Sequence, residues 1–214
     1  GPNRETLTKI WKFFTLNFGL SDAKNRRDSC DGFDICVEAY GGIKYYAMIP
    51  NTNEYLNFYE AENFCKDKNK TLSTISSESE QIELSKMAFE LSQQNQEGAR
   101  LWLGLVRKDT KDEFSWRYHV IDENNTKVDV TCDVTEPIFW ERDPDAYTED
   151  TDCVILDVDF DHTGNFSNHN ISNWEPVDCL KSLNGELGHA HGFLCTDNVP
   201  ETNKTNTDGT EGKT

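Results

Sequence analysis

The sequence lacks several motifs by which large classes of proteins are identified. It contains no C-x-x-C pair, no G-x-S-x-G or H-E-x-x-H motif and no glycine-rich phosphate loop. These absences argue against a structural zinc set, the common hydrolases and metalloproteases, and nucleotide-binding enzymes. We therefore expect that the chain is not an enzyme.

Basic residues and long apolar runs are also scarce. The 214-residue chain has 21 Lys and Arg against 39 Asp and Glu, which gives a formal net charge of -18. Such a charge argues against nucleic acid and anionic lipid as partners, while cationic partners or calcium fit better. The alternative is that the excess acid only keeps the protein in solution. Without a long apolar run, we expect no membrane insertion within this chain.

The cysteines and the glycosylation acceptor patterns point to the secretory route. Seven cysteines without a zinc-type spacing favour an oxidising compartment. The acceptor pattern N-x-S/T also occurs five times, at Asn69, Asn124, Asn165, Asn170 and Asn203. We expect sugar at these sites and an extracellular location, either secreted or as the ectodomain of a surface protein.

Composition and hydrophobic spacing divide the chain into three parts. Residues 1–43 are an N-terminal extension whose apolar residues at helical spacing, such as Leu7, Ile10 and Phe14, predict a short amphipathic helix. That helix either packs on the main domain or forms a dimerising neck. Residues 44–196 form the folded domain. Residues 197–214 have almost no apolar side chain and are expected to be a disordered, glycosylated tail or stalk.

The folded part predicts an α+β domain. A first helix begins near Glu54 or Asn57, and its spacing directs Cys65 toward a core. A capping box at residues 77–80 opens a second helix that ends near Gly98. Short apolar runs then predict antiparallel strands at residues 101–106, 114–118, 154–158 and 193–195. The polar stretches between them require disulfides or a metal to hold them.

From about Tyr45 to Thr196 the chain resembles the C-type lectin-like domain family. The resemblance rests on short motifs in the family order: Tyr59, Ala61 and Cys65, then Leu72-Ser73-Thr74-Ile75, Trp102-Leu103-Gly104-Leu105, Trp140 and Asp143-Pro144-Asp145. It implies the C-type lectin-like fold, with two helices, small antiparallel sheets and a long disulfide-braced loop region.

The resemblance also implies two disulfides. They are Cys65 with Cys195 and Cys153 with Cys179. Cys30, Cys36 and Cys132 remain. We expect Cys30 to pair with Cys36, which leaves Cys132 free or able to join two chains in a disulfide-linked dimer. Pairing of Cys132 with either N-terminal cysteine is the alternative.

Calcium is the cofactor that the family would supply, but this sequence keeps only part of the ligand set. Asp143 and Asp145 flank a proline as in the family, and Glu149 and Glu175 could add oxygens. The ligating aspartate of the family's W-N-D stretch is replaced by Pro176, which supplies no carboxylate. The alternative for the two aspartates is a turn stabilised by their own side chains.

The function expected from these residues is extracellular recognition of a protein partner, such as a receptor, an adhesion molecule or a secreted effector. The resemblance places the contacts on the long-loop surface from about Val134 to Asp178, with Asp143, Asp145, Tyr147 and Glu175 in it. The alternative is a calcium-dependent carbohydrate-binding lectin with a degenerate site and a glycan ligand.

Overall fold

The structure is a computed structural model that describes most of the expected domain. The described residues are 30–38, 42–50, 55–108, 113–134, 139–140, 151–164, 173–180 and 189–197. The predicted amphipathic helix and all but the first residue of the predicted tail lie outside them. The division of the chain at residues 43 and 196 stays a prediction.

The described residues contain two helices and nine strands, which confirms the α+β class. The helices are α2 (Phe58–Asp67) and α3 (Glu78–Asn95). The strands are β1 (Ile35–Glu38), β2 (Lys44–Met48), β3 (Lys70–Leu72), β4 (Gly98–Arg107), β5 (Phe114–Ile121), β6 (Lys127–Asp133), β7 (Cys153–Val158), β8 (Asn173–Val177) and β9 (His189–Asp197).

Both helices begin at polar capping residues. Asn57 caps α2, and its side chain accepts a hydrogen bond from the backbone N–H of Glu60 at 3.0 Å while Glu60 accepts one in return. Ser77 caps α3 by accepting a hydrogen bond from the N–H of Glu80 at 3.2 Å, but the Glu80 carboxylate accepts from the N–H of Ser76, so the expected capping box is only half formed. These bonds satisfy N–H groups that have no partner within the helix. Of the two starts expected for the first helix, the structure has Asn57.

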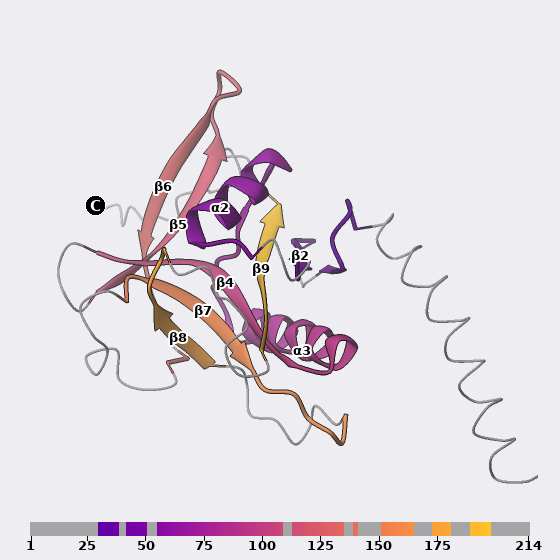
Figure 1. Ribbon diagram of the computed structural model, residues 1–214. Helices are drawn as coiled ribbons and strands as arrows, with labels where there is room; N and C mark the ends of the chain where they lie inside the picture. Colours follow the sequence, from indigo (N-terminus) through magenta and orange to yellow (C-terminus); the bar gives the residue numbers. More distant parts are fainter. Residues whose placement is uncertain are drawn as a thin grey trace, which may run out of the picture.

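Strand β4 is the centre of the sheet (Figure 1). It pairs with β5 and β7 in antiparallel fashion and with β9 in parallel. Strand β9 continues the sheet to β2 and β1, while β8 extends it from β7. The β5–β6 hairpin projects beyond the other strands (Figure 1). The parallel pair was not expected from the sequence, because its two strands are far apart along the chain.

Gly104 allows two other segments to approach β4 closely. A Cβ atom at this position would lie 2.8 Å from the carbonyl oxygens of both Leu72 and Arg117. Backbone atoms cannot move aside as a flexible side chain can, so the position requires glycine. The glycine of the W-L-G-L motif is thus explained by packing.

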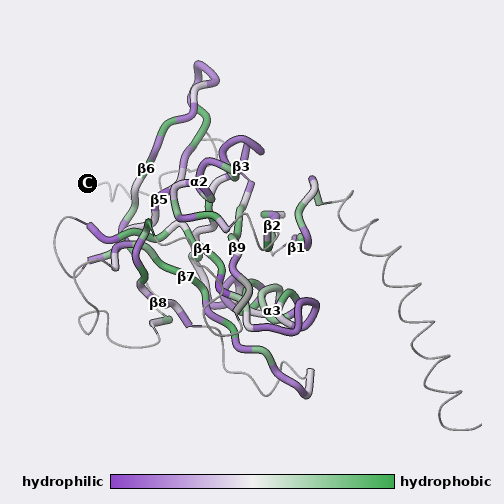
Figure 2. Tube along the Cα trace, viewed as in Figure 1, coloured by the Kyte–Doolittle hydropathy of each residue, from purple (hydrophilic) through white to green (hydrophobic). Residues whose placement is uncertain are grey.

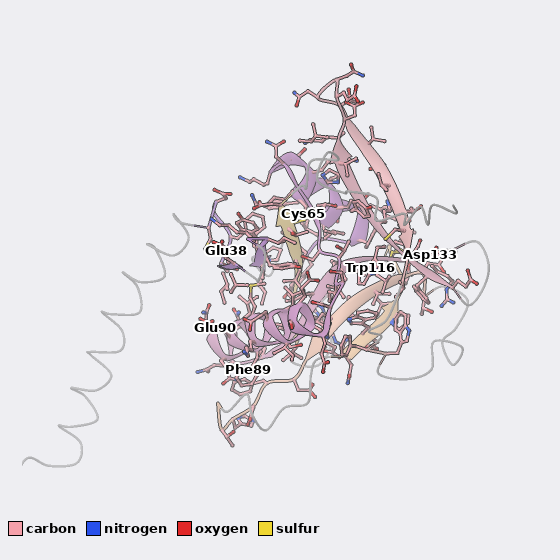
Figure 3. All side chains as sticks on the ribbon, turned by 180° about the vertical axis from the view of Figure 1, so that it is seen from behind. Glu38, Cys65, Phe89, Glu90, Trp116 and Asp133 are labelled. Carbon is pink, nitrogen blue, oxygen red and sulfur yellow. A yellow bond between two sulfur atoms is a disulfide. The ribbon has the colours of Figure 1, made fainter. Side chains whose placement is uncertain are left out.

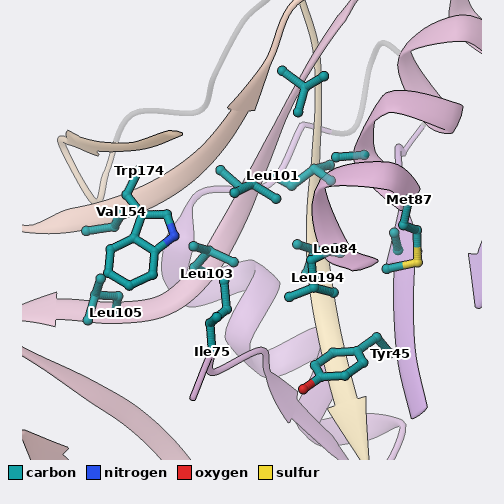
Figure 4. Packing of buried hydrophobic residues seen from close by; sticks show 14 of the residues in the cluster. Tyr45, Ile75, Leu84, Met87, Leu101, Leu103, Leu105, Val154, Trp174 and Leu194 are labelled. Carbon is teal, nitrogen blue, oxygen red and sulfur yellow. The ribbon is translucent and has the colours of Figure 1, made fainter. Parts of the chain in front are cut away.

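The two faces of the sheet bury two different cores. Neighbouring residues alternate between them: Leu101 and Leu103 lie in one core, while Trp102 lies in the other. We call the first the α3-side core, because it includes Leu84 and Met87 of α3 (Figure 4). We call the second the α2-side core; its buried members are Cys30, Phe33, Tyr46, Phe58, Ala61, Cys65, Leu72, Trp102, Cys153, Ile155, Cys179, Phe193 and Cys195.

Three disulfides lie in or against the α2-side core. They join Cys65 with Cys195, Cys153 with Cys179, and Cys30 with Cys36. The first two are the pairs that the family resemblance implies, and the third is the pair expected first for the N-terminal cysteines. In Figure 3, Cys65 is labelled among the side chains of α2. The first bond joins α2 to β9, and the other two join turns at Cys179 and Cys30 to β7 and β1 on the same side of the sheet.

Candidate functional site

An aromatic cluster holds the beginning of the expected ligand surface. Trp174 is fully buried, and its Nε1 atom donates a hydrogen bond to Oε1 of Gln81 on α3 at 3.0 Å. The Trp174 backbone N–H donates to the carbonyl of Phe139 at 2.7 Å, and the Trp140 ring lies 5.4 Å from the Trp174 ring. Residues 139–140 are therefore attached to β8 and through it to the core.

Arg107 holds the chain just before β7. Its guanidinium donates to the carbonyl of Thr151 at 3.1 Å and lies 3.2 Å from the carboxylate of Asp152. The same guanidinium lies over the Phe114 ring, 4.6 Å from the centroid. Because the sequence between Trp140 and Thr151 starts and ends at these attachments, its two ends are held on one part of the sheet.

Glu175 is the one proposed ligand residue that the structure describes, and it faces an arginine. Its Oε2 atom lies 4.0 Å from Nη2 of Arg100, whose Nε atom lies 3.5 Å from Asp157. These three side chains project from β8, β4 and β7 on the same face of the sheet, as the strand pairing requires. All three are partly exposed, so the group is a mixed-charge patch at the surface.

The described residues do not form a calcium site. Pro176 stands where the family has a ligating aspartate; it is buried and lies opposite Val154 in the β7–β8 pair. Of the described carboxylates in this part of the chain, Asp152 and Glu175 face arginines, and Asp178 accepts a hydrogen bond from the backbone N–H of Leu180. Across the described segments, no group of three or more His, Cys, Asp and Glu side chains could hold a metal ion. Calcium needs six to eight oxygen ligands, which this part of the chain does not bring together.

The other predicted site residues lie outside the described residues. These are Asp143, Asp145, Tyr147 and Glu149. Their part in a ligand site stays a prediction, and so does the set of four carboxylates proposed for calcium.

The glycosylation sites and the odd cysteine are placed in part. Asn69 and Asn124 are exposed, as sugar attachment requires. The remaining acceptor sites, Asn165, Asn170 and Asn203, lie outside the described residues. Cys132 is exposed on β6 and is a free thiol. The sugars and the dimer joined through Cys132 stay predictions.

Sequence reasoning missed the two arginines that organise this surface. Arg100 and Arg107 both lie on β4, and their carboxylate partners come from β7, β8 and the segment before β7. A sequence signal for these pairs does not exist, because the partners are about 45 or more residues away and meet only through the sheet pairing. The sequence shows that acids alternate with apolar residues in β7, but it does not show which side chains those acids face.

The fold and the disulfides define a class of recognition domains. The family model described as "Lectin C-type domain" matches residues 54–184. The chain belongs to this family, whose domains bind carbohydrate or protein. Within the described residues, we find no helix with the length and apolar character needed to cross a membrane.

Individual relatives cover the chain to different extents. A 76-residue segment is 34% identical to human C-type lectin domain family 4 member K; this is 36% of the present chain and 19% of that protein. The carbohydrate-recognition domain of cow CD23, crystallised in the presence of a GlcNAc2Man3 oligosaccharide, is 21% identical. The match covers 77% of this chain and 96% of the cow domain, with a TM-score of 0.45. The carbohydrate-recognition domain of mouse scavenger receptor C-type lectin is also 21% identical. The match covers 74% of this chain and 92% of that domain, with a TM-score of 0.41.

Proposed function

We propose that this domain recognises an extracellular protein through its long-loop surface without needing calcium. The surface comprises residues from about Val134 to Asp178, and its contacts include Asp143, Asp145, Tyr147 and Glu175. Its acidic character suits a partner with a basic face. The protein is extracellular, either secreted or exposed on a cell, and performs no chemistry on its partner.

One observation carries this proposal. The β8 segment that supplies calcium ligands in the family here presents buried Pro176 on one face and Glu175 beside Arg100 on the other. Sharing a metal ion with sugar hydroxyls requires a carboxylate that proline cannot replace. The surface around Glu175 and Arg100 instead offers both charges and partly exposed side chains, which are suited to a polar protein interface.

The first experiment separates the protein-binding function from the glycan-binding one. Calcium is titrated calorimetrically into the full chain, and thermal unfolding is followed with calcium and with a chelator. We expect no heat of binding and no shift in the unfolding midpoint, since a metal that binds only the folded state would raise it. Calcium binding together with retention on a glycan array, lost on chelation, would overturn the proposal in favour of the carbohydrate-binding lectin.

The second experiment tests the surface itself. The full chain is screened against a panel of recombinant extracellular proteins in the presence of chelator, and each hit is measured again with substituted chains. We expect Asp143→Ala with Asp145→Ala, and Glu175→Ala, to weaken binding by about tenfold or more. The matched control is Glu90→Ala with Glu123→Ala, which removes two exposed carboxylates elsewhere. Equal effects of test and control variants would place the contact outside the long-loop surface.

A further inference from the structure

A pocket of about 270 Å³ lies at the other side of the sheet from the disulfides, where β2, β3 and β9 come beside the β5–β6 hairpin. Neither the family motifs nor the expected ligand surface assigns a role to it. Residues of β2, β3, β5, β6 and β9 line it together with the segment before α3 and the first turn of that helix. Of the lining residues, Tyr45 and Ile75 are labelled in Figure 4, and Trp116 and Asp133 are labelled in Figure 3.

The pocket wall is aromatic and aliphatic, and its charged groups are acidic. Tyr45, Trp116 and Tyr118 supply rings, while no Lys or Arg is among the lining residues. His119 adds no positive charge, because burial lowers its pKa to about 4. A wall of this kind attracts a cation through the ring faces and the carboxylates together.

Glu80 is the carboxylate of the pocket that lacks a positive partner. Its Oε2 atom accepts hydrogen bonds from the N–H and the hydroxyl of Ser76, at 2.6 and 2.9 Å. Among the residues that the structure describes, no Lys, Arg or His side chain pairs with it. By contrast, Asp133 lies 2.5 Å from Lys108, and Asp197 lies 3.5 Å from Lys70. The negative charge of the pocket is therefore concentrated at Glu80.

A buried hydroxyl in the pocket wall also lacks a partner. Thr196 is 6% exposed, and its Oγ1 atom makes no hydrogen bond within the described part of the chain. It lies opposite Tyr45 in the β2–β9 pair and opposite Thr71 in the β3–β9 pair. An unsatisfied buried hydroxyl destabilises the fold, and a bound donor would remove that cost.

We propose that this pocket binds a small organic cation, a protonated primary amine carried on an aromatic or branched apolar body. The ammonium group pairs with Glu80 and donates a hydrogen bond to Thr196, and the apolar body packs on Trp116 and Ile75. Carboxylate and ring faces together select for positive charge, and the small volume selects for a compact ligand.

Cys132 provides a built-in reporter of occupancy. It lies opposite Trp116 in the β5–β6 pair, lines the pocket, and is an exposed free thiol. A ligand that fills the pocket therefore shields this thiol from a modifying reagent. Cys132→Ser provides the blank for the labelling measurement.

The probe is phenethylamine, added to the full chain while a neutral thiol reagent modifies Cys132. Saturating amine is expected to slow the modification by about fivefold or more, with a matching change in tryptophan fluorescence. At equal concentration, 2-phenylethanol and 3-phenylpropionate test whether the apolar body alone or the opposite charge suffices. Equal protection by all three compounds, or no protection by the amine, would overturn the proposal.

Two substitutions test the assigned contacts. Glu80→Gln is expected to weaken amine binding by about tenfold, whereas Glu78→Gln, which removes an exposed charge from the same helical turn, should leave it unchanged. Because Glu80 also bonds to Ser76, Thr196→Val provides a test that spares the start of α3. If one folded variant binds the amine with unchanged affinity, the contact assigned to that residue is wrong. If both variants do so, the proposed site is overturned.

Discussion

The two faces of the central sheet are stabilised in different ways. The α3-side core is built from aliphatic and aromatic residues without a single cysteine, and the 18-residue helix α3 covers it (Figure 4). The α2-side core faces a helix of only 10 residues and contains, or contacts, all six disulfide-bonded cysteines. It also borders buried charged groups, among them Glu62 and Lys70.

This difference shows where the domain needs covalent bonds. A long amphipathic helix buries enough apolar surface to hold one face of the sheet by itself. The other face is covered in part by less regular segments, such as the turn that begins at Cys30 and the turn at Cys179 after β8. In Figure 2, hydrophobic colour follows β7 through the middle of the sheet, while the tip of the β5–β6 hairpin is hydrophilic. Disulfides replace the missing helix packing on the α2 side.

The largest expected effect comes from opening the longest disulfide loop. Cys65→Ala with Cys195→Ala should lower the free energy of unfolding by about 5 kcal/mol, since the bond closes a separation of 130 residues. Urea unfolding measures the loss, and amide hydrogen exchange should show it first on the α2 side.

The control for this change is the short N-terminal loop. Cys30→Ala with Cys36→Ala opens a separation of only 6 residues and should cost about 2 kcal/mol. Equal losses from the two pairs, or exchange that rises uniformly over both faces, would contradict the comparison between the cores.

A smaller effect is expected from a cavity in the α3-side core. Leu84 is fully buried, so Leu84→Ala should cost about 3 kcal/mol through lost burial and the cavity left behind. Urea unfolding gives the value, and hydrogen exchange should now rise first in α3. Leu180→Ala is the matched control: Leu180 is 70% exposed, and its loss should change stability by less than about 0.5 kcal/mol. If hydrogen exchange rises in α2 before it rises in α3, the assignment of Leu84 to a separate α3-side core is contradicted.

The smallest effect concerns pH and comes from His119, a buried histidine of β5. His119 shares a face of β5 with Arg117, which forms a two-point ion pair with Glu62 at 2.9 Å. Burial lowers the pKa of His119 from 6.5 to about 4, and nearby Lys66 and Lys127 add to this lowering. The folded protein therefore keeps His119 neutral where the unfolded chain protonates it.

This difference in proton binding makes the folded state less stable as the pH falls. Stability from neutral His119 is present above pH 6.5 and is lost as the pH falls toward 4. Between pH 7.5 and 5.5 the free energy of unfolding should fall by about 1 kcal/mol, and His119→Gln should remove this slope. Urea unfolding at both pH values measures it. Burial raises the pKa of Glu62 and acts in the opposite direction in both proteins, so a slope unchanged by the substitution would refute the role of His119.

Local sequence patterns gave correct helices and several correct strands. Asn57 and Ser77 cap the two helices because their side chains satisfy N–H groups a few residues away, which is a purely local interaction. The apolar residues near Trp102 and in residues 154–158 gave strands for the same reason. The family motifs added the two long-range disulfides, which spacing alone leaves open.

The sequence by itself therefore determined the helices and the class of the fold, since these depend on neighbours in the chain and on composition. Only the tertiary structure decided which charges meet. Arg100 facing Glu175, the burial of Pro176, and a pocket that gathers Glu80 and Thr196 all depend on strands that pair across large separations. The energies of such contacts arise from distances and burial in space, which no local pattern encodes.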